Sequence, residues 1–366
     1  MNIVCDKTLL SAAIDGVSKA VTMRSSIPVL EGILLKAEGF QLTLTGYDLE
    51  MGIVTTIEAN IKEPGEIVLN AKLLSSMISR MPAGQISIVA ADNGKTTIQS
   101  GVAQFEIQSM PATDFPDLPN TGAEQTLTIK TGVLRDMIDR TCMPSVRTRK
   151  TRPHRRTVRD RTGQADHCSA GRLPSGYCGA PHTAVKDIRI IVPSKTMTEV
   201  SHLLANDDEE DVHISANRRY VVFTTAGYTI MSRLIEGEFL NYRNVIPAGS
   251  RTRVTIDTKD FISTIERASL IITERLKNPL RISFTEGKLW CAARQTSAAW
   301  WTSSALPARA TRWRSASITL SAGCAAQRPH RAGAHGDQRP VEPGEGAAGR
   351  GQRLLYLVLP VRFKND

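Results

Sequence analysis

Residues whose types and spacing could support chemistry lie mainly in two stretches, 143–186 and 290–353. Residues 344–349 read Gly-Glu-Gly-Ala-Ala-Gly, which is the glycine spacing of a loop that cradles the pyrophosphate of a dinucleotide. Such a loop must follow a β-strand, whereas Pro340 and Pro343 precede these glycines and cannot donate a strand hydrogen bond. We therefore expect no nucleotide site and no bound cofactor.

Six cysteine and histidine residues in and beside the first stretch could suggest a zinc site: Cys142, His154, His167, Cys168, Cys178 and His182. Structural zinc sites of the finger or ribbon type take their ligands from closely spaced pairs along the chain. These residues lack that paired spacing, so chance composition is the better interpretation. No metal is expected.

Two further clusters resemble binding surfaces. Trp300, Trp301 and Trp313 lie among arginines and could stack on bases, although an unstructured run is the simpler interpretation. Residues 207–211 form an acidic run between a predicted helix and a predicted strand, where we expect a solvated loop. The chain also lacks a phosphate-binding Gly-Lys-Ser/Thr loop, a His-Glu-x-x-His helix and a nucleophile elbow.

The formal charge of +10 is unevenly distributed over the 366 residues. Residues 143–186 carry a net charge of +8 and residues 290–353 a net charge of +6, so the rest of the chain stands at −4. The patterned part of the protein is therefore mildly acidic, and the basic character comes from two arginine-rich segments. Their positive charge leaves open an alternative function, a basic nucleic-acid-binding protein that acts through these segments.

The elements that would position functional residues form a repeat. Residues 67–119 and 191–247 each run from an Ile-Val pair through a lysine, an amphipathic segment and three β-rich runs to a closing Phe-containing segment that ends in proline. The two lysines, Lys72 and Lys195, are 123 residues apart, and Phe115 and Phe239 are 124 apart. A period this long predicts duplicated domains rather than a short-repeat solenoid.

The first copy is predicted to contain two helices and several antiparallel strands. Residues 3–21 have the apolar period of a helix capped by Asp6 or Thr8, and Asn70 can cap a second helix that ends near Pro82. Five strands are predicted, at residues 33–37, 41–45, 86–89, 96–100 and 104–107.

The second and third copies are recognisable but interrupted. The second begins with a helix at 131–140, loses its pattern at Met143 and resumes at Asp187. The third opens at Val254, loses its pattern after Leu289 and is recovered in the last residues. We therefore predict an α+β protein of three tandem domains, each with two helices and antiparallel sheets, at residues 1–120, 126–250 and 253–366; the second and third are incomplete in sequence.

Duplicated α+β units that meet edge to edge can continue one sheet across their boundaries, which removes exposed strand edges. If such an array closes into a ring, equivalent helices lie on the same side. The lysines and arginines at the helix ends would then gather on one surface of an otherwise acidic molecule. Such a surface suits sequence-independent contact with phosphates.

Four motifs together resemble the bacterial DNA polymerase III β subunit, the replication sliding clamp: residues 27–30 (Ile-Pro-Val-Leu), 42–50 (Leu-Thr-Leu-Thr-Gly-Tyr-Asp-Leu-Glu), 114–118 (Asp-Phe-Pro-Asp-Leu) and 356–362 (Tyr-Leu-Val-Leu-Pro-Val-Arg). The resemblance covers residues 1–142, 187–289 and 354–366. It implies a homodimeric ring of six DNA-clamp domains around duplex DNA. Such a ring tethers the polymerase and has no catalytic site of its own.

The resemblance also implies which residues make contacts. Four cations would face DNA in the central hole: Arg24, Lys72, Arg80 and Lys195. At the dimer contact, Phe105 and Ile107 of one chain would pack on Leu270 and Ile271 of the other. Considered without the resemblance, the four cations are solvated helix ends, and the four apolar residues belong to an edge strand and a core helix.

A groove for partner peptides lies between the second and third domains in this family. The matching positions are Leu240, Asn244, Val245, Leu357, Val358, Leu359, Pro360, Val361 and Arg362. The implied partners are the DNA polymerase III alpha subunit, the clamp loader and other proteins that carry a clamp-binding motif. The Thr-x-Gly-basic-Arg-Leu run expected for the opposite wall is absent from residues 143–186.

Residues 143–186 and 290–353 depart from the family pattern. We hypothesise that they are read in a shifted frame of a GC-rich gene, because the motifs resume in place on the far side; the rival explanation is a basic insertion. The cysteines form no disulfide-like framework, the amino terminus has no signal-peptide pattern, and no apolar run approaches the length of a membrane span. We therefore expect a cytoplasmic protein that does not enter a membrane.

Overall fold

The structure is a computed structural model that forms two compact units. Unit 1 comprises residues 1–139, 155–166 and 181–237, and unit 2 comprises 140–154, 167–180 and 238–366. Copy 1, copy 2 and copy 3 denote below the predicted repeats at 1–120, 126–250 and 253–366. The residues described are 1–22, 24–119, 122, 125–141, 155–161, 164–170, 175–181, 183–184, 189–237, 258–269, 279–285, 288–294, 299–305, 316–321 and 353–357.

Copy 1 opens with a strand where a helix was predicted. β1 spans Asn2–Asp6 and α1 spans Lys7–Val17. The prediction of a helix from residue 3 was therefore wrong for residues 3–6, which form a strand. Ile3 and Cys5 are buried because β1 pairs with strands on both sides, a tertiary fact that a five-residue pattern does not reveal. The predicted cap is confirmed, since the Asp6 carboxylate accepts the backbone N–H groups of Thr8 and Leu9 at 2.7 and 3.2 Å.

The strands predicted at residues 33–37 and 41–45 are confirmed, and they pair as a hairpin. β2 (Gly32–Glu38) and β3 (Gln41–Tyr47) pair across a turn in which Gly39 has a φ of 63°. Three further strands, which were not predicted, follow: β4 (Met51–Glu58), β5 (Asn60–Glu63) and β6 (Gly65–Asn70). Short one-turn helices η1 (Ser18–Ala20) and η2 (Pro28–Glu31) connect α1 to β2.

The second half of copy 1 follows the predictions closely. α2 (Ala71–Arg80) begins at Asn70, whose side chain accepts the backbone N–H of Leu73 at 3.1 Å. Three strands follow: β7 (Gln85–Ala90), β8 (Lys95–Ser100) and β9 (Ala103–Gln108). Gly94 has a φ of 79° in the turn between β7 and β8, where an Asp-Asn-Gly sequence favours a positive φ. The closing segment contains β10 (Met110–Pro111) and η3 (Ala112–Asp114) before buried Phe115.

Copy 2 repeats this order of elements. The helix predicted at 131–140 is α3 (Thr131–Thr141), and the segment around Lys195 forms α4 (Ser194–Leu203). Its strands are β11 (Gln125–Lys130), β12 (Arg155–Arg161), β13 (Gln164–Ala170), β14 (Ser175–Pro181), β15 (Thr183–Ala184), β16 (Arg189–Pro193), β17 (Asp211–Ala216), β18 (Tyr220–Thr224) and β19 (Thr229–Arg233). Strands therefore occur within 143–186, where the sequence shows no sustained alternation.

Corresponding strands of copies 1 and 2 pair in the same way. In copy 1 the order β5-β1-β7-β8-β9 forms a separate five-stranded sheet, and in copy 2 the order β15-β11-β17-β18-β19 repeats it. The pairing of β2 with β6 is likewise repeated by β12 with β16. The two copies thus share one topology, which is the outcome that the internal repeat predicted.

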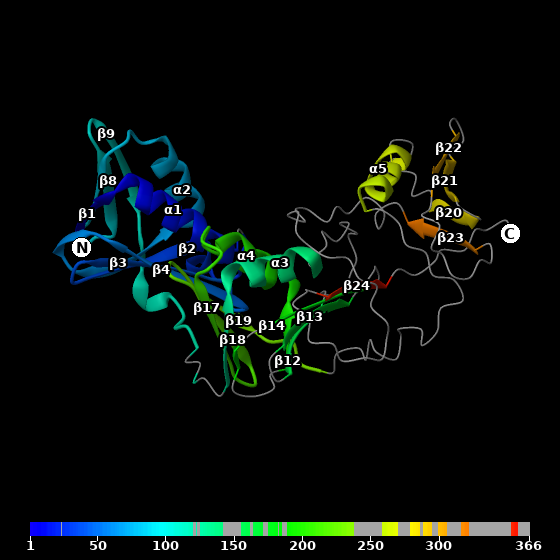
Figure 1. Ribbon diagram of the computed structural model, residues 1–366. Coiled ribbons are helices and arrows are strands. Elements are labelled where there is room, and N and C mark those ends of the chain that lie inside the picture. The colour runs from blue at the N-terminus through cyan, green and yellow to red at the C-terminus, as the bar shows by residue number, and fades with distance from the viewer. Residues whose placement is uncertain are drawn as a thin grey trace. The chain divides into compact units, whose positions relative to one another are not determined.

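A single sheet crosses the boundary between copies 1 and 2. It contains ten strands in the order β10-β6-β2-β3-β4-β19-β18-β17-β11-β15. The crossing is the antiparallel pairing of β4 with β19, from Met51 opposite Ser232 to Val54 opposite Thr229. The expectation that duplicated units continue one sheet across their boundary is therefore confirmed for this pair of copies (Figure 1).

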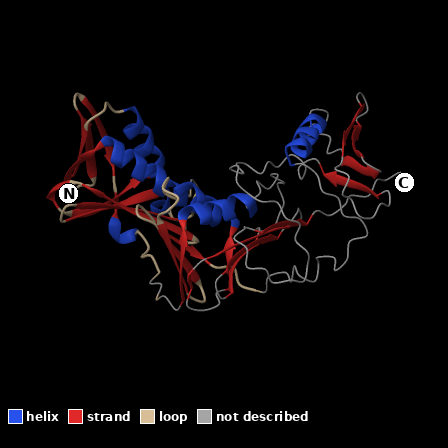
Figure 2. Cartoon of the chain, in the orientation of Figure 1, coloured by secondary structure: helices blue, strands red, loops and turns tan. Residues whose placement is uncertain are grey.

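Helices and strands of unit 1 lie on different sides. Figure 2 shows α2, α1, α4 and α3 in a row along one side of unit 1, with the strands of the sheet mainly below them in this view. α1 packs on β3 and β4 and against α2. The buried core under α1 includes Leu10, Ile14 and Val17, whereas the neighbouring Leu9 is 47% exposed.

Unit 2 contains α5 (Thr258–Ser269) and the strands β20 (Pro279–Thr285), β21 (Lys288–Arg294), β22 (Ala299–Ala305), β23 (Ala316–Ser321) and β24 (Arg353–Leu357). The sheet order β22-β21-β20-β23 repeats the order β4-β3-β2-β6 of copy 1. Trp300 and Trp301 lie in β22, so the expectation of an unstructured run was wrong there, because cross-strand pairing with β21 orders the backbone. None of the helices in the described residues is long and apolar enough to span a membrane.

The close packing of α1 on β3 leaves no room for a side chain at Gly46. A Cβ atom at this position would lie 2.2 Å from the carbonyl oxygen of Val17 at the end of α1, and backbone cannot move aside as a flexible side chain can. We expect Gly46→Ala to lower the free energy of unfolding by about 1–3 kcal/mol, the usual range for overpacking, as measured by urea denaturation. Gly227→Ala is the control, since a Cβ there meets nothing within 4 Å. Equal stability of the two variants would contradict this account.

Candidate nucleic-acid interface

Three of the four predicted DNA contacts are exposed cations without a protein partner. Arg24 lies between η1 and η2, Lys72 in the first turn of α2 and Arg80 in its last turn. Within the described residues, none of these three side chains has a hydrogen bond or an ion pair. Their charges are therefore available to an external anion.

Lys72 is poorly placed for the stability of its own helix. Backbone N–H groups give the start of a helix a partial positive charge, so a cation there costs about 0.3–1 kcal/mol. Arg80, in the last turn, has the favourable placement instead. A lysine that helix stability does not explain supports a role in binding, and the sequence pattern had already placed it at the opening of a helix.

Lys195, the fourth predicted contact, is already paired within the chain. Its ammonium Nζ lies 2.6 Å from Oδ2 of Asp48 in the turn between β3 and β4. The Asp48 side chain is only 8% exposed, whereas that of Lys195 is 53% exposed. The structure thus separates this lysine from Arg24, Lys72 and Arg80, a difference that sequence spacing did not reveal.

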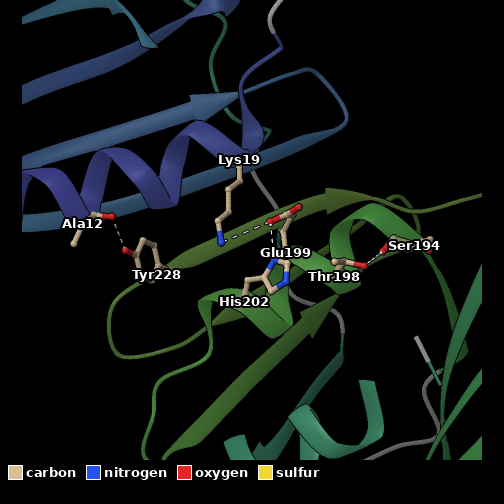
Figure 3. A network of polar contacts seen from close by, with 7 residues as sticks. All are labelled: Ala12, Lys19, Ser194, Thr198, Glu199, His202 and Tyr228. Carbon is tan, nitrogen blue, oxygen red and sulfur yellow. Dashed lines mark hydrogen bonds and ion pairs between the residues drawn. The ribbon is translucent and has the colours of Figure 1, made fainter. Parts of the chain in front are cut away.

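A polar network joins the helices of copies 1 and 2 (Figure 3). Lys19 Nζ lies 3.8 Å from the Glu199 carboxylate, and His202 Nδ1 lies 3.4 Å from the same oxygen. The Tyr228 hydroxyl donates to the carbonyl oxygen of Ala12 in α1 at 3.2 Å, so the turn between β18 and β19 rests on that helix. Burial raises the pKa of Tyr228, which keeps the hydroxyl a donor.

The acidic run is a loop at residues 207–210, as predicted, whereas Asp211 begins β17; the run also supports copy 2. Asp208 pairs with Arg135 of α3 at 2.5 Å, and Asp211 pairs with Lys130 at 2.9 Å. The carbonyl oxygens of Glu210 and Asp208 accept the first backbone N–H groups of α3, from Thr131 and Gly132. The hydrogen bond to Asp211 raises the pKa of Lys130. The described residues contain no cluster of potential metal ligands.

Strand β9 carries the residues predicted for the dimer contact. β9 pairs with β8 on one edge and has no strand on the other edge within the described part of the chain. Phe105 is 37% exposed, and Ile107 is half-buried. Leu270 and Ile271 lie outside the described residues.

Most of the predicted partner groove lies outside the described residues. This applies to Leu240, Asn244, Val245, Val358, Leu359, Pro360, Val361 and Arg362. Leu357 is the last residue of β24, which pairs with β14. The glycines 344–349 also lie outside, as do the side chains of Cys142, His154, His167, Cys168, Cys178 and His182.

The buried thiols are poor candidates for chemistry. Desolvation by burial raises the pKa of Cys5 to about 12 and that of Cys291 to about 11. The reactive form of cysteine is the thiolate, which is scarce far below the pKa. Neither thiol is therefore suited to act as a nucleophile.

Comparison with solved structures defines the class of protein. A DNA polymerase III beta subunit from Eubacterium rectale superposes with a TM-score of 0.87 at 24% identity, covering 100% of both chains. The DNA polymerase sliding clamp from Bacillus subtilis gives a TM-score of 0.86 at 24% identity over 99% of each chain. At this level of identity the likeness shows the fold, which is the α+β fold of the DNA clamps.

Sequence comparison then gives the family. The sequence model of the DNA polymerase III beta subunit N-terminal domain matches residues 1–119, and that of the central domain matches residues 170–241. The beta sliding clamp of Bacillus subtilis is 29% identical over 295 residues, which cover 77% of this chain and 78% of the relative. That of Caulobacter vibrioides is 28% identical over 309 residues, covering 81% and 82%. The chain belongs to the DNA polymerase III beta subunit family of sliding clamps.

The central-domain match revises the extent of the resemblance. It begins at residue 170, inside the arginine-rich segment, whereas the motifs we recognised resume only at residue 187. The family pattern therefore reaches into the segment that we had set apart.

Charge removal tests the free cations. We expect Lys72→Gln/Arg80→Gln to weaken binding to duplex DNA and to reduce the slope of log K against log salt by about 0.9 for each phosphate that the variant no longer neutralises, as measured by fluorescence anisotropy. The matched control is Lys36→Gln/Lys62→Gln, which removes the same charge from exposed positions on strands β2 and β5. An equal weakening in both variants would show that only net charge matters.

Proposed function

We propose that the chain is a non-catalytic sliding clamp that encircles duplex DNA and tethers the replicative polymerase. The observation that carries this proposal is that α2 presents Lys72 and Arg80, and the segment between η1 and η2 presents Arg24, as exposed cations whose side chains have no partner in the described residues. Family membership supports the same function. The comparisons do not support the alternative of a basic protein that acts through its arginine-rich segments.

The proposed DNA contact is weak and independent of sequence. Lysine and arginine side chains that meet phosphates carry no base information, and their contribution falls as salt releases fewer counterions. Such contacts allow movement along the duplex. Retention on DNA then depends on enclosure, so the ring must be closed.

The way in which the ring closes is proposed by analogy with the boundary between copies 1 and 2, where β4 pairs with β19. In topology, β9 of copy 1 corresponds to β19 of copy 2, and β22 of copy 3 corresponds to β4 of copy 1. The outer edges of β9 and β22 lack a strand partner within the described residues, whereas β19 and β4 pair with each other. We propose that β9 of one chain pairs with β22 of a second chain, giving a homodimer of three clamp domains per chain.

Phe105 and Ile107 would then contribute the apolar contacts of that interface, with Leu270 and Ile271 opposite them. The partner groove is proposed at Leu240, Asn244, Val245 and residues 357–362. We propose the polymerase alpha subunit, the clamp loader and other motif-bearing proteins as its ligands, and the cytoplasm as the location of the protein. Family membership supports these assignments.

The test of the function is topological. We expect the chain, loaded by a bacterial clamp loader on a singly nicked circular DNA, to remain bound during gel filtration and to be released when the circle is cut with a restriction enzyme. An enclosed duplex can leave a ring only through a free end, whereas a protein held by charge alone is indifferent to cutting. Equal retention on circular and linear DNA at the same salt concentration would refute the proposal.

The dimer has its own test. We expect Phe105→Arg to shift the chain from dimer to monomer in sedimentation velocity, with at least a tenfold rise in the dimer dissociation constant, because a charge replaces an apolar contact at the interface centre. Phe40→Arg is the control, since Phe40 is 84% exposed at the turn between β2 and β3. A Phe105→Arg variant that remains dimeric would contradict the assignment of β9 to the interface.

A further inference from the structure

We infer that Lys195 and Asp48 form a latch that holds copies 1 and 2 together, so Lys195 is a positioning residue and not a DNA contact. The ammonium of Lys195, in the first turn of α4 in copy 2, lies 2.6 Å from the Asp48 carboxylate in copy 1. The inference on DNA rests on the proposed function, whereas the latch itself does not.

Asp48 organises the turn between β3 and β4. Its Oδ1 accepts the backbone N–H groups of Glu50 and Met51 at 3.1 and 2.7 Å, which leaves Oδ2 for Lys195. Within this turn Leu49 has a φ of 69°, a left-handed backbone conformation that costs free energy for residues other than glycine. The carboxylate hydrogen bonds therefore stabilise a turn that would otherwise be unfavourable.

That turn begins the strand that crosses to copy 2. Met51, the first residue of β4, lies opposite Ser232 of β19, and the Arg233 backbone N–H donates to the Glu50 carbonyl oxygen at 2.8 Å. On the other side of the latch, the Thr196 hydroxyl lies 2.7 Å from the Ser232 hydroxyl, both buried. The ion pair thus fastens the start of α4 to the end of the β4–β19 pairing.

Lys195 occupies an electrostatically unfavourable position at the start of α4. Pro193 is the N-cap and offers no side-chain hydrogen bond, and a cation in the first helical turn opposes the helix dipole. Asp48 supplies the missing negative charge. Because the Asp48 side chain is 8% exposed, it is shielded from water and salt in a way that an ordinary surface carboxylate is not.

Asp48 already neutralises the Lys195 ammonium, so a DNA phosphate could gain the full charge of Lys195 only by displacing Asp48. Displacement would leave a largely buried carboxylate without its cation, which proteins avoid. We therefore assign the DNA contact to Arg24, Lys72 and Arg80. Lys195 instead fixes the helices of copy 2 relative to those of copy 1.

The experiment is a double-mutant cycle on the full-length chain, read by amide hydrogen exchange. We expect Lys195→Gln and Asp48→Asn each to speed exchange about tenfold at residues 51–54 and 229–233, with no change in β7 and β8. The asparagine oxygen can still accept the two turn N–H groups. We expect the double variant to exchange about as fast as either single variant, because both remove one interaction. Lys195→Arg, which keeps the positive charge, should exchange as slowly as the wild type.

Lys95→Gln is the matched control. Lys95 pairs with Glu106 at 2.7 Å and is also 53% exposed, but its carboxylate partner is 48% exposed. We expect this variant to change exchange in β8 and β9 by less than twofold. The Lys195→Gln variant should also leave the salt slope of DNA binding unchanged.

Three results would overturn the inference. The first is an exchange rate in Lys195→Gln within twofold of the wild type, and the second is a double variant whose rate increase equals the product of the two single increases. The third is a salt slope of DNA binding that falls by about 0.9, the value for one phosphate, in Lys195→Gln. Hydrogen exchange needs no DNA. A wild-type chain that fails to bind or enclose DNA would therefore remove the proposed function and leave the latch to be judged on the exchange data alone.

Discussion

The antiparallel pairing of β4 with β19 is the constraint on which unit 1 depends. Each copy taken alone would expose the backbone N–H and C=O groups of an outer strand, and such an edge invites pairing with other chains. Joining the two edges satisfies these groups and makes one ten-stranded sheet from two copies. The positions of the helices follow from this sheet, and the cations on those helices are positioned in turn.

Apolar packing supports this crossing from the strand side. Phe115 and Leu118, in the segment that leads from copy 1 to copy 2, pack with Tyr47 of copy 1 and Met231 of copy 2. Phe115, which precedes Pro116, has the extended φ of −80° and ψ of 124° that a following proline favours, so the segment does not continue as a helix. The same residues that read as a linker in the sequence are therefore part of a shared core, which limits independent movement of the two copies.

Charge is divided between two tasks in unit 1. Lys195, Lys19 and Arg135 pair with carboxylates of the chain, whereas Arg24, Lys72 and Arg80 have no partner in the described residues. The first group holds the copies and their helices together. The second group is available to phosphates, and its separation from carboxylates is a property of the tertiary structure alone.

Local rules in the sequence predicted the helices well and their first strand poorly. Asn70 and Asp6 were recognised as caps because their side chains act on backbone only two or three residues away. β1 was missed because Ile3 and Cys5 are buried by partners about sixty and more than eighty residues distant. Leu73 is apolar but 51% exposed, because the face that α2 buries is formed by Ala71, Leu74 and Ile78.

The sequence by itself determined the duplication, the caps and turns, and the family, because repeated motifs and short-range hydrogen bonds are written in residue order. It did not determine the strands of the arginine-rich segment, the crossing of β4 with β19 or the partner of Lys195. Those depend on contacts such as that between residues 48 and 195, which are 147 positions apart. No local pattern encodes such a pair, because the fold alone brings the two side chains within 2.6 Å.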